Sequence, residues 1–145
     1  SAIINGGKLV TPHFGMYTST SDGSVVNEFA YSSTEAAIEL DTSEKMKTIL
    51  EGVVSEGGGT KAYIEGYSIG GKTATSQKLP RGSGKYISSF IGFAPADNPQ
   101  VIAMCLIDEP TGVYYGGTIA APVIKTLYEN ILPYLGIEQT EQLEK

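Results

Sequence analysis

The sequence has little cysteine, little charge and no tryptophan. Its one cysteine, Cys105, excludes an internal disulfide and a zinc site built on cysteines. Charged residues make up 18% of the 145 positions, and lysine and arginine form no run. The formal net charge of −6 disfavours nucleic acid as a partner, because binding there needs a basic face that displaces counterions.

Long apolar segments are also missing. The sequence contains no run of 18 apolar residues and therefore predicts no membrane span. The first residues lack the basic start and apolar stretch of a signal peptide. Glycine, by contrast, is abundant, with 18 of the 145 residues. This is well above the share of glycine in an average protein, about 7%. This excess predicts frequent turns and close backbone contacts.

The first third of the chain predicts a hairpin and then a helix. Residues that favour strands at 14–20 and 24–31 flank Asp22-Gly23, a turn that commonly joins antiparallel strands. Helical spacing of apolar residues then predicts a helix over 41–56. The predicted apolar face of this helix comprises Met46, Ile49, Leu50, Val53 and Val54.

Three strands and a second helix follow. Residues 67–76, 85–94 and 101–107 predict strands joined by short turns, which pair as an antiparallel sheet. The nearly continuous apolar run of the third strand predicts burial on both of its faces. A period of 3.6 residues from Ile119 to Leu135 predicts the second helix. The expected fold is α+β, an antiparallel sheet of at least three strands flanked by two amphipathic helices.

Residues 66–73, Gly-Tyr-Ser-Ile-Gly-Gly-Lys-Thr, match the phosphate-loop pattern letter for letter. A phosphate loop has to follow a buried strand and open a helix, whereas the preceding residues are polar and the following ones show no helical apolar stripe. We therefore place residues 72–75 on a strand at the edge of a cleft. Lys72 and Ala74 then share one face, and Thr73 and Thr75 share the other. Such an edge offers hydroxyls and backbone N–H groups to a carboxylate or to the oxyanion of an acyl transfer.

The Lys-Thr-Ala-Thr segment resembles the Lys-Thr-Gly signature of penicillin-recognising serine enzymes. Four further segments resemble that family in the same order along the chain, at residues 2–12, 50–57, 90–95 and 115–122. The chain is therefore similar to the C-terminal half of the transpeptidase domain of a class B-like penicillin-binding protein. The resemblance implies that residues 1–137 are part of such a domain and that residues 138–145 form a polar tail.

The resemblance implies a serine-type D,D-transpeptidase that crosslinks peptidoglycan stem peptides, binds β-lactams and needs no metal or other cofactor. The family's Ser-x-x-Lys and Ser-x-Asn motifs do not occur in this sequence. Ser21-Asp22-Gly23 has some likeness to the second motif but fits a hairpin turn better. We therefore expect this chain to be inactive alone, and its parent to be anchored at the extracytoplasmic face of the bacterial cell membrane.

The same resemblance implies roles within the site. Lys72 would lie opposite the absent serine and lend positive charge. The hydroxyls of Thr73 and Thr75 would hold the carboxylate of a β-lactam or a stem peptide, and the Thr75 backbone N–H would be one oxyanion donor. Ala74 stands where the family usually has glycine, and its methyl group would lie on the Lys72 side of the strand.

Several alternatives stay open. The chain is also compatible with a fragment of a β-lactam sensor or D,D-carboxypeptidase, with a non-catalytic module that binds peptidoglycan or a protein, and with the phosphate loop. Apolar surface exposed by truncation predicts a homodimer or strand exchange. We interpret His13 as a surface residue, Cys105 as a small buried hydrophobe, and Asp108-Glu109 as the start of a loop.

Overall fold

The structure is a computed structural model that describes residues 1–34 and 37–139. The chain divides into two compact units, residues 1–44 and 45–145. Within the described ranges, no helix is both long enough and apolar enough to cross a membrane. The three-stranded sheet and the last helix belong to the second unit, while the described residues of the first unit hold short strand pairs and the start of a helix.

The first unit contains two short antiparallel strand pairs. β1 (Leu9–Val10) pairs with β4 (Ser33–Thr34), and β2 (Tyr17–Ser19) pairs with β3 (Val25–Glu28). The turn between β2 and β3 contains Asp22-Gly23, which confirms the predicted hairpin. His13 is exposed, as expected, and its ring stacks on that of Tyr31 with centroids 3.3 Å apart.

The Asp22 carboxylate organises this turn and makes it sensitive to acid. It accepts hydrogen bonds from the Thr20 hydroxyl and from the Ser24 backbone N–H. These bonds, chiefly the one from Thr20, lower the pKa of Asp22 from 3.8 to about 2. Because the pKa of Asp22 is lower in the folded chain than in the unfolded chain, its ionised carboxylate stabilises the turn at pH values above about 4. This stabilisation is lost as the pH falls from about 4 to about 2.

We therefore expect an NMR titration of the Asp22 carboxyl group to give a midpoint near the depressed value of about 2. The matched variant Thr20→Val removes the largest cause and should move the midpoint back toward 3.8. A midpoint already at 3.8 in the unaltered chain would show that the turn does not form as described.

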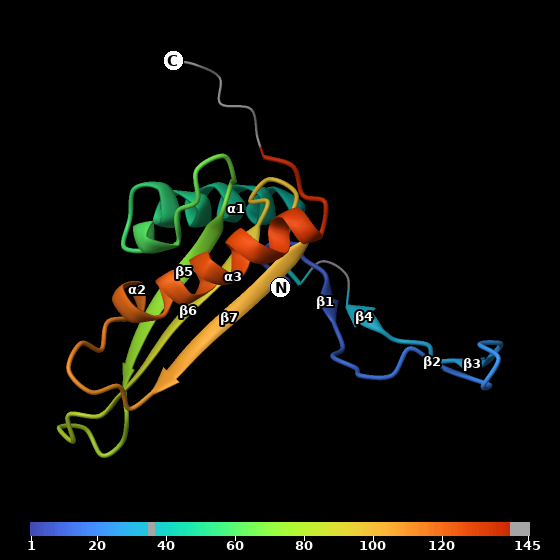
Figure 1. The fold of residues 1–145 in the computed structure, drawn as a ribbon, viewed down its shortest axis with the longest axis horizontal. Helices are drawn as coiled ribbons and strands as arrows, with labels where there is room; N and C mark the ends of the chain where they lie inside the picture. The colour runs from blue at the N-terminus through green and yellow to red at the C-terminus, as the bar shows by residue number, and fades with distance from the viewer. Residues whose placement is uncertain (35–36, 140–145) are drawn as a thin grey trace. The chain divides into compact units, whose positions relative to one another are not determined.

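The second unit is built on the predicted antiparallel sheet. β5 (Gly70–Gln77), β6 (Tyr86–Ala94) and β7 (Val101–Asp108) lie in the order β5-β6-β7 (Figure 1). The register pairs Thr73 with Phe90, and side chains alternate between the two faces of the sheet. No helix begins at Lys72, and the second half of the segment that matches the phosphate loop, from Gly70 onward, is a strand.

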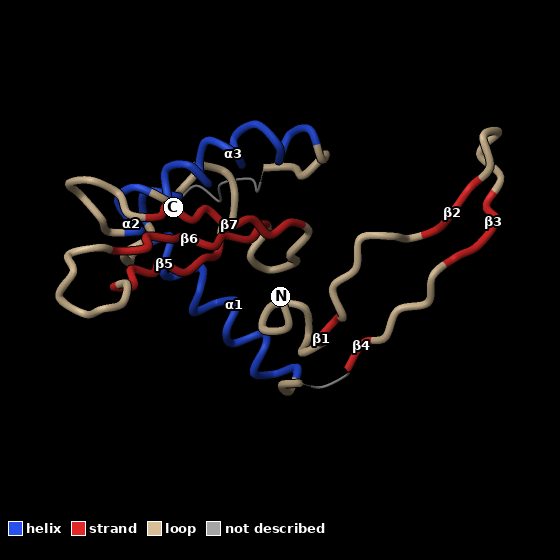
Figure 2. The backbone as a smooth tube through the Cα atoms, turned by 90° about the horizontal axis from the view of Figure 1, so that it is seen from below, coloured by secondary structure: helices blue, strands red, loops and turns tan. Residues whose placement is uncertain are grey.

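The helices agree with the predicted spans to within a few residues. α1 (Leu40–Ser55) is followed by the short 3-10 helix η1 (Thr60–Ala62), and the sheet is followed by α2 (Gly116–Ile119) and α3 (Ala121–Tyr134). Figure 2 shows α3 as a layer on one face of the sheet. Gly136, at a φ of 69°, follows the end of α3 as predicted.

The core of the second unit lies between the sheet and α3. Phe90 and Tyr128 are fully buried there, and the Tyr128 hydroxyl donates a hydrogen bond to the Gly92 carbonyl oxygen at 2.6 Å. Burial raises the pKa of Tyr128. Cys105 is half-buried and packs against this core, so it is less enclosed than the sequence predicts.

The apolar face predicted for α1 is only partly buried, and the prediction that β7 is buried on both faces is wrong. Of the apolar face predicted for α1, Val54 is buried but Ile49 is 59% exposed, because only one edge of that face meets the core. In the part of the chain that the structure describes, β7 is covered on one face, by α3, and not on both. Its residues alternate between half-buried and exposed, and the exposed side chains on the face opposite α3 are Ile102, Met104, Leu106 and Asp108.

Candidate functional site

A groove of about 350 Å³ lies along β5 in the second unit. Its walls come from three separate parts of the sequence: residues 58–61, the middle of β5, and the first turn of α2. The lining residues are Gly58, Thr60, Lys61, Thr73, Ala74, Thr75, Tyr115, Gly116, Gly117 and Thr118. Three of the four residues selected from the sequence therefore meet in one cavity.

The hydrogen-bond ladder determines which backbone groups of β5 remain available. Among residues 1–34 and 37–139, β5 pairs with β6 alone. The backbone N–H of Lys78 donates to the Lys85 carbonyl oxygen at 2.9 Å, in continuation of the ladder. Antiparallel residues bond to their neighbour at every second position. The even-numbered residues of β5 therefore bond to β6, and Thr73 and Thr75 turn their N–H and C=O groups toward the free edge.

Two glycines allow α2 to lie close to β5 and to the segment at Gly58. The Gly116 backbone N–H donates to the Thr75 hydroxyl oxygen at 3.0 Å. A Cβ atom on Gly116 would lie 2.3 Å from the Ala74 carbonyl oxygen, and one on Gly117 would lie 2.3 Å from the Gly58 carbonyl oxygen. Since real Cβ contacts are longer than this, the shape of the groove requires glycine at both positions.

Lys72 lies at the edge of the strand rather than inside the groove. Its side chain is exposed, and its Nζ donates a hydrogen bond to the Thr73 carbonyl oxygen at 2.7 Å. Because that carbonyl points to the free edge, the ammonium group lies at this edge too. Ala74 is also exposed, and it shares the Lys72 face of β5.

Sequence reasoning selected the β5 residues but missed the opposite wall of the groove. Lys61 comes from η1, and Tyr115 precedes α2. The Tyr115 ring lies 4.7 Å from that of Tyr114, which stacks on Tyr86 at 4.0 Å. The consecutive glycines at the start of α2 were the available signal, since such pairs often mark close backbone approach.

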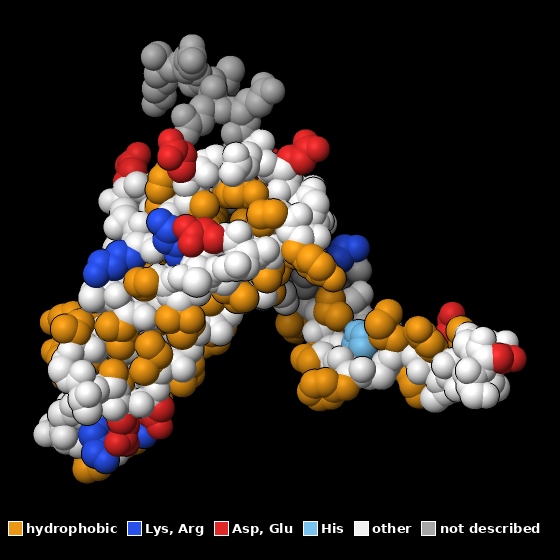
Figure 3. All heavy atoms as spheres, in the orientation of Figure 1, with side chains coloured by type: hydrophobic (Ala, Val, Ile, Leu, Met, Phe, Trp, Pro, Cys, Tyr) orange, Lys and Arg blue, Asp and Glu red, His pale blue; other side chains and the backbone are white. Residues whose placement is uncertain are grey.

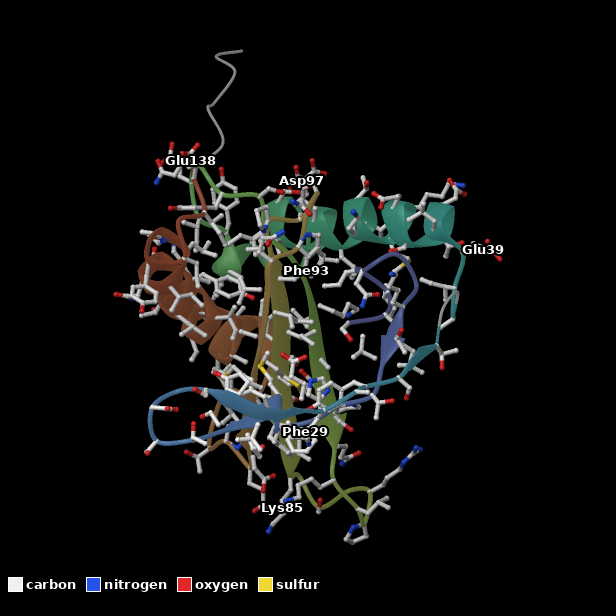
Figure 4. The ribbon with its side chains drawn as sticks, turned by 90° about the vertical axis from the view of Figure 1, so that its right-hand side faces the viewer. Phe29, Glu39, Lys85, Phe93, Asp97 and Glu138 are labelled. Carbon is white, nitrogen blue, oxygen red and sulfur yellow. The ribbon has the colours of Figure 1, made fainter. Side chains whose placement is uncertain are left out.

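Ion pairs tie together the end of the sheet beyond Gln77. The Lys78 ammonium lies 2.9 Å from Asp108 and 2.7 Å from Glu109, and Lys85 lies 2.9 Å from Glu109. Figure 3 shows these charges gathered at the tip of the sheet, and Figure 4 shows Lys85 there with Asp97 at the other end. The two lysines lower the pKa of Glu109, and the two carboxylates raise that of Lys78.

Asp108 and Glu109 thus form ion pairs where β7 ends and the next loop begins. The sequence had indicated the start of this loop at these two residues. Among residues 1–34 and 37–139, no three His, Cys, Asp or Glu side chains are grouped so that they could hold a metal ion.

Comparison with known proteins agrees with this geometry. The family model described as penicillin binding protein transpeptidase domain matches residues 1–129. The chain is 38% identical over 151 aligned positions to stage V sporulation protein D of Bacillus subtilis, covering all of this chain and 23% of that protein. It is 41% identical over 107 positions to a probable peptidoglycan D,D-transpeptidase PenA of Neisseria meningitidis, covering 70% of this chain and 18% of that one.

Solved structures of penicillin-binding transpeptidases also resemble this chain. Penicillin-binding protein 3 of Mycobacterium tuberculosis, complexed with ampicillin, superposes with a TM-score of 0.81 at 26% identity, over 99% of this chain and 35% of that one. The D,D-transpeptidase domain of a peptidoglycan glycosyltransferase from Eggerthella lenta superposes with a TM-score of 0.78 at 25% sequence identity. The match covers 94% of this chain and 30% of that one. The chain belongs to the penicillin-binding protein transpeptidase domain family, and its α+β fold is that of these relatives. It spans 18–28% of the length of the first curated relatives.

Proposed function

We propose that this chain is the C-terminal part of a peptidoglycan D,D-transpeptidase and that β5 holds the substrate for acyl transfer. The observation that carries the proposal is the free edge of β5. There the outward backbone groups of Thr73 and Thr75, their hydroxyl side chains along the groove and the Lys72 ammonium group occur together. The relatives include proteins named as peptidoglycan D,D-transpeptidases, which supports the same reaction.

The proposed reaction transfers an acyl group twice. A serine outside this chain attacks the carbonyl carbon of the D-Ala–D-Ala peptide bond, the C–N bond breaks, and the terminal D-alanine leaves with the proton of the serine hydroxyl. An amine of a neighbouring stem peptide then attacks the serine ester, forms the crosslink and returns a proton to the serine.

Three residues of β5 act in the proposed reaction, and Thr75 acts through both its backbone and its side chain. The Thr75 N–H stabilises the negative oxygen that forms during each attack. The hydroxyls of Thr73 and Thr75 hold the terminal carboxylate, and Lys72 favours negative charge at the edge. A β-lactam enters the same site and acylates the serine, with the opened ring retained on the enzyme.

The proposed setting is the outer face of the bacterial cell membrane, because peptidoglycan stem peptides are crosslinked there. Because the nucleophile lies outside residues 1–145, this chain is inactive by itself. The exposed face of β7 offers apolar surface for a second copy of the isolated chain.

The test is to incubate the complete protein that contains this chain with a stem pentapeptide ending in D-Ala–D-Ala and an acceptor amine, and to measure D-alanine release and crosslinked product. We expect release coupled to crosslinking. Release with only the hydrolysed peptide as product would indicate a carboxypeptidase, and no release in a folded protein would contradict the proposal.

A further inference from the structure

We propose that Lys61 is a specificity-determining residue, whose ammonium group recognises the carboxylate of the ligand held at Thr73 and Thr75. This inference rests on the proposed function and adds to it a charge from outside the motif-bearing strand. Among the described residues that line the groove, Lys61 carries a charge and none is acidic.

The segment that carries Lys61 packs on the threonine side of β5. A Cβ on Gly117 would lie 2.3 Å from the Gly58 carbonyl oxygen and 3.1 Å from the Thr73 methyl carbon. The Gly58 segment, the start of α2 and the Thr73 side chain therefore meet at one place. Three residues after Gly58, Lys61 lines the same groove as the two threonines.

Lys72 does not place a positive charge on the face of β5 that carries the Thr73 and Thr75 hydroxyls. Its side chain belongs to the opposite face of β5, and its Nζ is hydrogen-bonded to the Thr73 carbonyl oxygen at 2.7 Å. Lys61, by contrast, is exposed, and within the described part of the chain no ion pair or hydrogen bond occupies its ammonium group. The two lysines thus occupy different positions, Lys72 at the strand edge and Lys61 across the groove.

The ligand class follows from charge and size. Among the described residues, the groove is lined by one lysine, by five residues that carry hydroxyl groups and by no carboxylate, and this lining favours an anion even though the whole chain has a net charge of −6. A volume of about 350 Å³ lies at the small end of ligand sites and suits a terminal amino acid residue with its carboxylate.

The experiment compares two probes that differ in this carboxylate, benzylpenicillin and its methyl ester, by their second-order rates of acylation of the complete protein. Lys61→Met should lower the rate with benzylpenicillin about fivefold, the effect of one partly exposed charge, and leave the rate with the ester unchanged. Lys61→Arg should restore the preference for the free acid. The matched control Lys125→Met removes a lysine of α3 outside the groove and should change neither rate.

An equal fall with both probes in Lys61→Met would indicate a structural role and overturn the inference. Acylation of all variants with an unchanged ratio of the two rates would also overturn it, while leaving the proposed function in place. If a folded wild-type protein is acylated by neither probe, the proposed function is wrong and this inference fails with it.

Discussion

In the complete protein, Thr75→Pro is expected to lower the rate of acylation by benzylpenicillin about 100-fold, the effect of losing one oxyanion donor. The ladder turns the Thr75 N–H away from β6 and toward the free edge. Proline replaces this N–H by a ring carbon, and it breaks no bond of the sheet because the group is not used there. The loss should therefore affect the reaction more than the fold.

Two matched variants separate the N–H from other effects of the substitution. Thr75→Val keeps the N–H and removes only the hydroxyl, so it should lose much less activity than the proline variant. Gln77→Pro removes another outward N–H of the same strand, at a residue that does not line the groove, and should leave acylation nearly unchanged. A Thr75→Pro protein that folds and acylates at the wild-type rate would show that this N–H is not an oxyanion donor.

Gly116→Ala is expected to destabilise the second unit by about 3 kcal/mol, at the upper end of the cost of overpacking. The new Cβ would lie 2.2 Å from the Ser89 carbonyl oxygen and 2.3 Å from that of Ala74. Both are backbone atoms of paired strands, which cannot move aside as a flexible side chain does. The start of α2 would have to leave β5, and the hydrogen bond from Gly116 to Thr75 would break.

Urea unfolding of the chain measures this effect. Gly52→Ala is the matched control, because its added Cβ meets no atom within 4 Å beyond the adjacent backbone of its own helix, α1, where alanine is favoured over glycine. We expect Gly52→Ala to be neutral or stabilising. Equal unfolding midpoints for the two variants would mean that α2 does not pack against β5 as described.

The sequence predicted the parts of the fold that depend on local patterns. Asp22-Gly23 marked a turn because few other residues allow the backbone to reverse there, and Gly23 has a φ of 89°. The strand at Lys72 was predicted correctly despite the phosphate-loop match, because no helical stripe follows it. The burial of β7 was predicted wrongly, since an apolar run does not reveal how many of a strand's faces another element covers.

Three of the residues selected from the sequence form one wall of the groove, and the opposite wall was missed. Thr73 and Thr75 could be selected because a single motif contains both of them. Lys61 could not, because its place in the groove depends on α2, whose Gly116 is 41 residues beyond Thr75 in the sequence. Ala74 was expected on the same side as Lys72, and the register of β5 with β6 agrees.

Labelling with a fluorescent penicillin, followed by mass spectrometry of the labelled peptide, tests the central claim most directly. The claim is that residues 1–145 provide the substrate-holding edge while the nucleophile lies elsewhere in the protein. We predict that the complete protein is labelled on a serine outside these residues and that the isolated chain is not labelled. A covalent adduct on any serine of the isolated chain would contradict the account.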